Sequence, residues 1–321
     1  MDSIYLEKGM THPNKARPWS VEEARFVLEK IDPADLSSAG KRAHDYIEKD
    51  ISGDKKEKKL LDLGEVLRFQ IGARLNPEFF ARINLDKDGE TSEKEYRLQH
   101  GYEERKAFLE LPLELTLGNS VYMITELSGK EEHGTVNGVT DNYTNLIFDD
   151  PNARIDLYFP FRSFISTGSR HWNLQFGRDS LSWGNAHSGN MMLSDYSDFY
   201  DFIGLSFYGK RIKLTNIFAV MDPISPSGDP MDGETPDTNS YAFMGRRLDI
   251  RITERVLLSL NEAVTLIDIE GELVRDLNYL MIFHNRMIPD RSNSLLSAEL
   301  SVNPWKNLNF YGQFAMDEFQ T

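Results

Sequence analysis

The chain has 321 residues, a formal net charge of −15 at pH 7 and a pI near 5.0. This acidic balance, without a basic stripe, argues against nucleic acid as a partner, because phosphates require a basic counter-surface. The absence of cysteine excludes disulfides, thiolate metal sites and a cysteine nucleophile. No segment approaches the ~18 consecutive apolar residues of a membrane helix. This criterion does not detect a membrane β-strand, because about half of the residues in such a strand are polar.

The first part of the chain, residues 1–60, predicts a small helical region. Ser20 is a good N-cap, and Glu23 occupies the capping-box position three residues later. Apolar residues then recur at helical spacing until the helix is expected to end before Pro33. A second helix is expected over residues 39–51, where apolar side chains again share one face.

Alternating strands are predicted from about residue 63 onward. The clearest covers residues 109–117, where leucines alternate with Glu110, Pro112, Glu114 and Thr116. Successive side chains of a strand point to opposite faces, and this length is close to the ~9–11 residues that cross a bilayer as a tilted strand. The same alternation recurs at 67–75, 155–162, 172–176, 247–252, 296–302 and 308–316. We count about ten to twelve strands, which is typical of all-β barrels and large sandwiches.

A soluble sandwich also alternates, so the pattern alone does not prove a membrane protein. The long apolar face, rich in aromatic residues and repeated in strand after strand, favours barrel strands with lipid outside and a wet lumen inside. Carboxylates on one face can form a general acid–base pair, but opposed rows of Arg and Glu in a barrel more often form a salt-bridge lattice. The predicted lattice comprises Arg68, Arg74, Glu110, Glu114, Arg178, Asp179, Arg247, Asp249 and Arg251.

One segment, residues 177–190, is rich in polar groups, glycine and tryptophan. It lacks the G-x-S-x-G nucleophile elbow and the P-loop lysine, whereas its aromatic, amide and carboxylate groups suit carbohydrate. The alternative is a constriction in which Arg178 and Asp179 pair. The candidate ligand-binding residues are Trp183, Asn185, His187 and Asn190. The seven histidines show no metal-binding spacing, so we expect no metal, no cofactor and no catalytic residue.

Several segments, taken in order, resemble the bacterial capsule assembly Wzi family. They are residues 17–20, 176–178, 183–184, 193–195, 246–251, 260–264, 277–279, 283–285 and 308–319. The resemblance implies an outer-membrane β-barrel with a helical bundle at its periplasmic end. It also implies non-enzymatic binding and organisation of capsular or other extracellular polysaccharide. Asp179 and Asn185 depart from the family pattern, where a neutral amide and a Gly-Pro turn are expected.

The expected fold is therefore mainly β: a large antiparallel outer-membrane-type β-barrel, incomplete here, with a small N-terminal helical bundle. Residues 1–60 would form a periplasmic plug, and residues 61–321 barrel strands truncated at the C-terminus. The expected partners of this monomer are surface polysaccharide and outer-membrane lipid. A porin-like channel and an envelope enzyme acting on glycan or lipid remain alternatives. Without a signal peptide at Met1, we expect a fragment cut at both ends, and a natural short cytoplasmic protein is the competing explanation.

Overall fold

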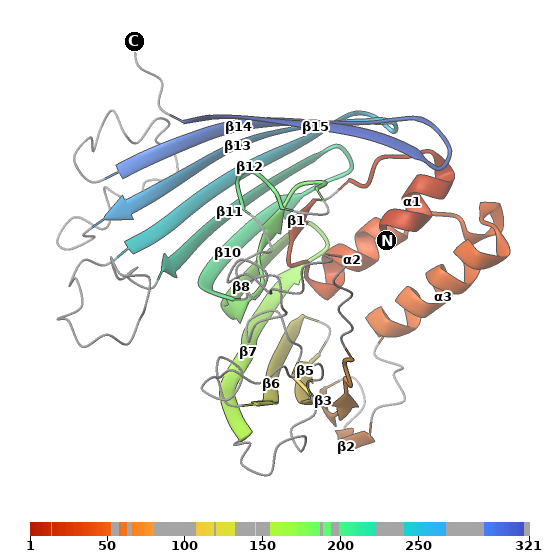
Figure 1. The fold of residues 1–321 in the computed structure, drawn as a ribbon. Coiled ribbons are helices and arrows are strands. Elements are labelled where there is room, and N and C mark those ends of the chain that lie inside the picture. Colours follow the sequence, from red (N-terminus) through yellow and green to blue (C-terminus); the bar gives the residue numbers. More distant parts are fainter. Residues whose placement is uncertain are drawn as a thin grey trace, which may run out of the picture. The chain divides into compact units, whose positions relative to one another are not determined.

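The computed structural model describes residues 1–13, 15–52, 58–62, 66–79, 107–118, 120–131, 145, 155–186, 189–193, 199–221, 241–267 and 292–317. The helices are α1 (Asp2–Lys8), α2 (Val21–Leu28), a 3-10 helix (Pro33–Asp35) and α3 (Ser38–Ser52). Figure 1 shows the strands, which are β1 (Ala16–Arg17), β2 (Lys58–Asp62), β3 (Leu67–Ile71), β4 (Arg74–Leu75), β5 (Leu109–Leu117), β6 (Val121–Glu131), β7 (Ile155–Ser169), β8 (Trp172–Asp179), β9 (Ser182–Trp183), β10 (Tyr200–Tyr208), β11 (Ile212–Met221), β12 (Tyr241–Thr253), β13 (Val256–Ile267), β14 (Ser292–Trp305) and β15 (Leu308–Asp317).

The predicted helices are confirmed. The Ser20 hydroxyl accepts the Glu23 backbone N–H at 3.1 Å and caps α2, and α3 extends the predicted range by one residue at each end. The three helices pack around a small apolar core, in which the Tyr5 hydroxyl donates to the Val27 carbonyl at 2.6 Å. Among the described residues, no helix combines the length and apolar character needed to cross a membrane.

The chain divides into two compact units. The first comprises residues 1–56, 120–122 and 164–321, and the second comprises residues 57–119 and 123–163. The helices therefore group with the C-terminal strands, whereas the sequence suggested a boundary near residue 60.

The strands form a large antiparallel sheet, so the protein is mainly β. Twelve strands pair in the order β15-β14-β13-β12-β11-β10-β8-β7-β6-β5-β3-β2, while β4 pairs with β5 beside this path and β1 pairs with β9. Across the described ranges the order has two ends, β15 and β2, so the sheet is not closed and the predicted barrel is not observed.

The predicted strand over 109–117 coincides with β5, but the one over 67–75 is broken into β3 and β4. The Gly72 N–H at the break donates to the Pro112 carbonyl at 2.9 Å. Leu115 pairs with Phe69 and Leu109 with Leu75, so β5 is the common partner of both short strands.

In the first unit, short and long connections alternate along the sheet. The turns 170–171, 209–211, 254–255 and 306–307 are short, whereas the segments 180–199, 222–240 and 268–291 are long. The helices lie at the short-turn end (Figure 1), where the Asn307 N–H donates to the Leu6 carbonyl at 2.8 Å and Arg170 pairs with Glu29 at 3.2 Å. The N-terminal segment therefore covers one end of this sheet.

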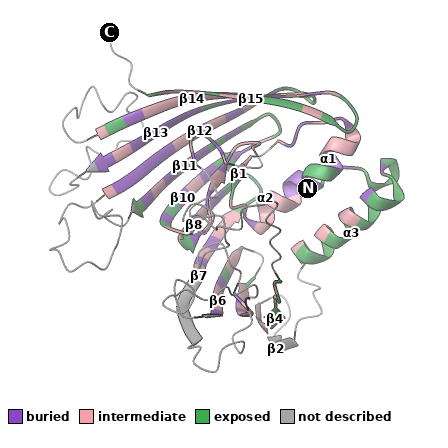
Figure 2. Ribbon diagram, viewed as in Figure 1, coloured by how far each residue is buried: buried purple, intermediate pink, exposed green. Residues whose placement is uncertain are grey.

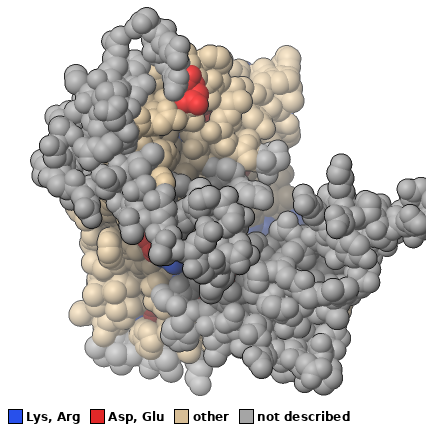
Figure 3. Space-filling view, turned by 60° about the vertical axis from the view of Figure 1, so that its left-hand side comes forward, with Lys and Arg blue, Asp and Glu red and all other residues tan. Residues whose placement is uncertain are grey.

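Over much of this sheet the two faces have inverted polarity, although an apolar core that includes Ile217, Ala219 and Phe243 also lies on the buried face. The face toward the N-terminal segment buries polar side chains: Asn173, Gln175, Ser206, Lys213, Thr215, Arg247, Asp249, Arg251, Ser259, Asn261, Glu299, Ser301 and Asn303. The opposite face exposes apolar ones: Trp172, Phe176, Ile203, Phe207, Ile212, Leu214, Val220, Ile252, Leu260, Leu300, Phe310 and Phe314. Burial therefore alternates along β8 and β10 (Figure 2), and the described surface in Figure 3 carries few charged side chains.

The apolar face is not exposed over its whole extent. Near the long connections of β12 and β13, a cluster on this face is buried: Ala242, Met244, Val264 and Leu266, with Phe218 packed against it. Beside it Arg246 pairs with Glu262 at 3.2 Å. The exposed apolar surface is thus concentrated on β8, β10, β11, β14 and β15.

Candidate functional site: a buried polar lattice

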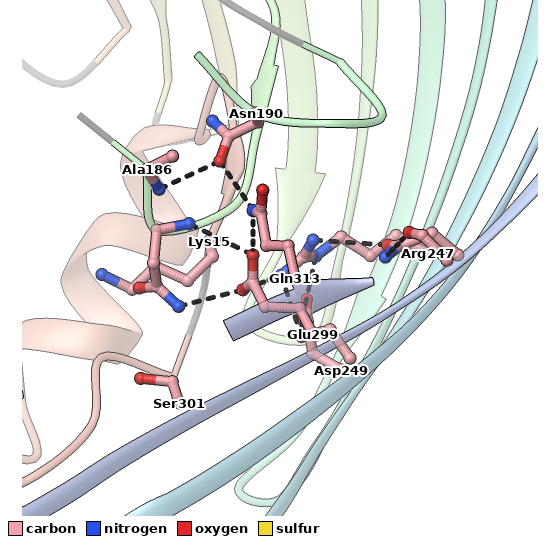
Figure 4. Close-up of polar contacts among 12 residues, drawn as sticks. Lys15, Ala186, Asn190, Arg247, Asp249, Glu299, Ser301 and Gln313 are labelled. Carbon is pink, nitrogen blue, oxygen red and sulfur yellow. Dashed lines mark hydrogen bonds and ion pairs between the residues drawn. The ribbon is translucent and has the colours of Figure 1, made fainter. Parts of the chain in front are cut away.

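Arg247 is the centre of a polar lattice on the buried face of the first unit (Figure 4). Its side chain is 1 % exposed and donates to Asp249 at 2.9 Å, to Ser259 at 2.8 Å and to Glu299 at 3.2 Å. It also donates to Asn261 at 3.3 Å. One guanidinium therefore binds groups from three adjacent strands, β12, β13 and β14, and offsets two buried carboxylates.

Strand register creates this lattice. Antiparallel pairing places Asp249 opposite Ser259, Ser259 opposite Glu299, and Glu299 opposite Gln313. Paired residues share a face, so one polar row crosses the strands from β12 to β15. Lys213 of β11 stands opposite Asp249 and extends the row.

Glu299 fastens the segment after β9 to the sheet. Its carboxylate accepts the Asn185 side-chain amide at 2.9 Å, the Asn185 backbone N–H at 3.2 Å and the Gln313 amide at 2.5 Å. Gln313 in turn donates to Asn190 at 2.9 Å, and Asn190 also accepts the Ala186 N–H at 3.0 Å. The segment is thus held to β14 and β15 by charge-assisted hydrogen bonds to Glu299 and by neutral hydrogen bonds through Gln313 and Asn190.

Gly184 is required where this segment meets the lattice. Its φ of 134° is a backbone conformation that residues other than glycine rarely adopt. A Cβ atom here would collide with the side chains of Asn190, Gln313 and Glu299. The Gly184 N–H donates to the carbonyl of Lys15 at 3.1 Å, so the same residue joins the segment to the residue before β1.

A second buried ion pair joins α2 to the sheet. Lys213 Nζ lies 2.6 Å from Glu23 Oε1, and both side chains are almost fully buried. Asn173 donates to the same carboxylate at 2.9 Å, and Lys213 also donates to the Ala16 carbonyl at 3.3 Å. Burial raises the pKa of Glu23, while the Lys213 charge and the Asn173 hydrogen bond act in the opposite direction.

Asp2 makes a more exposed cluster at the start of the chain. It lies 3.0 Å from Lys15, 3.4 Å from Arg17 and 3.9 Å from His12. Burial alone would raise the pKa of Asp2, but the nearby Lys15, His12 and Arg17 lower it to about 2.

The predicted charge lattice is found in several pieces. In the second unit Arg74 pairs with Glu110 at 3.8 Å and with Glu126 at 3.9 Å. Glu114 is buried and lies on β5, the strand that carries Glu110. Arg68 lies on β3, where its register partner is Thr116. In the first unit Arg251 donates to Glu254 at 2.6 Å.

The prediction that Arg178 belongs to the buried lattice is wrong. Its neighbour Asp179 is buried and accepts the Ser180 N–H at 2.9 Å, so Arg178 lies on the opposite, exposed face. There it pairs with Asp201 at 3.6 Å, both side chains being largely exposed. The expected Arg178–Asp179 pair is wrong for the same reason, because adjacent strand residues point to opposite faces.

The four predicted ligand residues have different surroundings. Trp183 is 1 % exposed and packs in a core with Ala16, Ala219 and Phe243, so neither ring face is open to a sugar. Asn185 is half-buried and Asn190 is buried; both belong to the lattice. His187 lies outside the described residues.

Sequence reasoning missed several members of the lattice: Glu23, Lys213, Ser259, Asn261, Glu299 and Gln313. Glu299 and Gln313 do stand on the polar parity of predicted strands. The missing information was the register that brings β12, β13, β14 and β15 into one row.

Fold and lattice together define a mainly β protein with a large antiparallel sheet and a polar, N-terminally covered face. No protein-family model and no curated protein matches this chain. The resemblance to the Wzi family therefore stays a prediction that depends on the ordered segments themselves.

Proposed function

We propose that this chain belongs to a β-barrel of the bacterial outer membrane that binds and helps organise capsular or other extracellular polysaccharide without covalent chemistry. The observation that carries the membrane part is the inverted polarity of β8 to β15. A water-soluble sandwich buries its apolar face and exposes its polar face. Here the buried face carries Arg247, Asp249 and Glu299, and the exposed face carries Phe176, Ile203 and other large apolar side chains.

Lipid is the environment that suits this arrangement. Exposed apolar patches beyond a few hundred Å² are rare on soluble monomers, whereas a membrane barrel presents an apolar band to hydrocarbon and keeps polar groups inside. Short turns at one end of the sheet and long connections at the other are also typical of outer-membrane β-barrels. The closed barrel, its lipid partner and its outer-membrane location are parts of this proposal.

The covered polar face favours attachment over a diffusion channel. The N-terminal segment meets it through the Lys213–Glu23 pair and through the Asn303 amide, which donates to the Met10 carbonyl at 2.8 Å. The segment after β9 is tied to Glu299. A porin-like pathway would need this interior to be open.

The polysaccharide part rests on the resemblance and on the polar segment around Asn185. Amide groups can donate to and accept from sugar hydroxyls. In this proposal Trp183 and Asn190 hold the segment in place, while Asn185 and His187 are the residues that meet a glycan. Trp183 is thereby given a packing role instead of the stacking role suggested by the sequence.

A charge on the apolar face tests the membrane part. Ile203, at the middle of β10, is 43 % exposed. If its face meets lipid, Ile203→Arg lowers the free energy of unfolding from lipid vesicles by about 2–4 kcal/mol. If it meets water, the change is within about 0.5 kcal/mol. Tyr46→Arg is the control, because Tyr46 is 73 % exposed on α3 and the change should be small.

Binding of labelled capsular polysaccharides to the full chain in detergent tests the second part. We expect saturable binding to one polysaccharide class, weakened in Asn185→Ala and unchanged in Asn216→Ala, since Asn216 lies opposite Arg246 on the other face. If the protein binds no surface polysaccharide, the proposed glycan binding is wrong, and the proposed membrane location is unaffected. Turnover of a glycan, lost in Asp179→Asn, would replace binding by an enzymatic function.

A further inference from the structure

Helix α3 carries a cluster of potential metal ligands that is independent of the sheet. The imidazole of His44, the carboxylate of Asp45 and the carboxylate of Glu48 offer ligand atoms that all lie within 4.8 Å of one another. His44 Nδ1 is 4.0 Å from Asp45 Oδ1 and 4.0 Å from Glu48 Oε2. We propose that these residues bind one divalent transition-metal ion, with zinc as the best-suited candidate.

The buried imidazole is the observation that points to a ligand. His44 is 7 % exposed, and its Nδ1 atom has no hydrogen-bond partner among the described residues. Leaving a buried polar atom unsatisfied costs free energy. The two carboxylates stand on the side of this nitrogen, so a cation between them would bond to the nitrogen and neutralise adjacent negative charges.

The helix geometry suits a single ion. His44 and Glu48 are one turn apart on the same side of α3, and Asp45 follows His44 directly. Zinc bonds of about 2.1 Å in a tetrahedral arrangement place ligand atoms about 3.4 Å apart. The Asp45 and Glu48 side chains are 64 % and 68 % exposed, so small rotations can draw their oxygens in toward His44.

Ligand type selects the class of ion. An imidazole nitrogen suits zinc, copper or nickel, whereas calcium and magnesium prefer sites made only of oxygen. Three protein ligands leave a fourth position for water or another ligand. The sequence-based expectation of no metal considered histidine pairs, and a site with one histidine and two carboxylates escapes that criterion.

Calorimetric titration of the full chain with zinc chloride, in detergent near pH 7.5, tests the proposal. We expect one saturable site whose affinity falls at least about tenfold in Glu48→Gln and in Asp45→Asn. Asp50→Asn is the matched control, since Asp50 is exposed on the same helix outside the cluster, and it should bind zinc like the parent chain. Both ligand substitutions are at exposed positions, and circular dichroism checks that α3 remains folded.

Absence of saturable zinc binding would overturn the proposal. Parent-like affinity in either Glu48→Gln or Asp45→Asn would overturn it equally, because the ion would then be held elsewhere. Neither result bears on the membrane or glycan assignments, which depend on other residues.

Discussion

Removing the Arg247 side chain is the most informative perturbation of the lattice. Arg247→Ala deletes hydrogen bonds to Asp249, Ser259, Asn261 and Glu299, and it leaves two buried carboxylates without their shared cation. Breaking a buried ion pair from one side costs about 3–5 kcal/mol, since the remaining charge must be protonated or hydrated. We therefore expect the free energy of unfolding to fall by about that amount.

Urea unfolding in detergent, followed by tryptophan fluorescence, measures the loss. The control is Arg178→Ala, which removes an arginine of the same sheet from a pair whose side chains are 44 % and 63 % exposed. Exposed pairs contribute under about 1 kcal/mol, so this variant should resemble the parent chain. Equal stabilities of the Arg247 and Arg178 variants would refute the view that the lattice organises the interior.

Other predictions address the segment after β9, the α2 contact and the N-terminus. Gly184→Ala should lower the free energy of unfolding by about 1–3 kcal/mol in urea titrations, because alanine is strained at a φ of 134°; an unchanged value would contradict the assigned backbone. Lys213→Ala leaves Glu23 buried without its cation and should cost about 3–5 kcal/mol, with faster hydrogen exchange in α2; parent-like exchange would argue against this anchor. Asp2→Asn should lower the melting temperature above pH 4. That difference should close as the pH falls from about 4 to about 2, because the pKa of Asp2 is about 2 when folded and 3.8 when unfolded. A difference independent of pH would exclude the pairing of Asp2 with Lys15.

Local patterns predicted the local structure well. The Ser20 cap, the helix over 38–52 and the parity of β5, β8 and β12 all follow from interactions within a few residues. Alternation also predicted that one face is polar. It also favoured the polar face as the inner one, and the first unit does bury polar side chains on the face that the N-terminal segment covers. It did not predict the individual contacts between them, such as the Lys213–Glu23 pair.

The site was less accessible to sequence reasoning, because it depends on distant partners. Arg247 and Glu299 are 52 residues apart, and only the registers of β12, β13 and β14 bring them together. Trp183 was expected to be available to sugar because its neighbours are polar and small. Instead Gly245, where a Cβ would lie 2.6 Å from the Trp183 ring, leaves a recess in the sheet that accepts the indole. A glycine on a strand far along the chain thus determines whether this tryptophan is buried.

We propose that the exposed apolar face of β8 and β10 to β15 contacts lipid, whereas the opposite face does not. The four tryptophans provide a direct measurement, since Trp172 and Trp305 are 39 % and 67 % exposed and Trp183 is 1 % exposed. Lipids brominated on their acyl chains quench only indoles that they contact. In vesicles of such lipids we predict strong quenching, most of it lost in the Trp172→Phe, Trp305→Phe double variant and retained in Trp183→Phe. Fluorescence unaffected by brominated lipid, or quenching that survives the double variant, would contradict contact between this face and lipid.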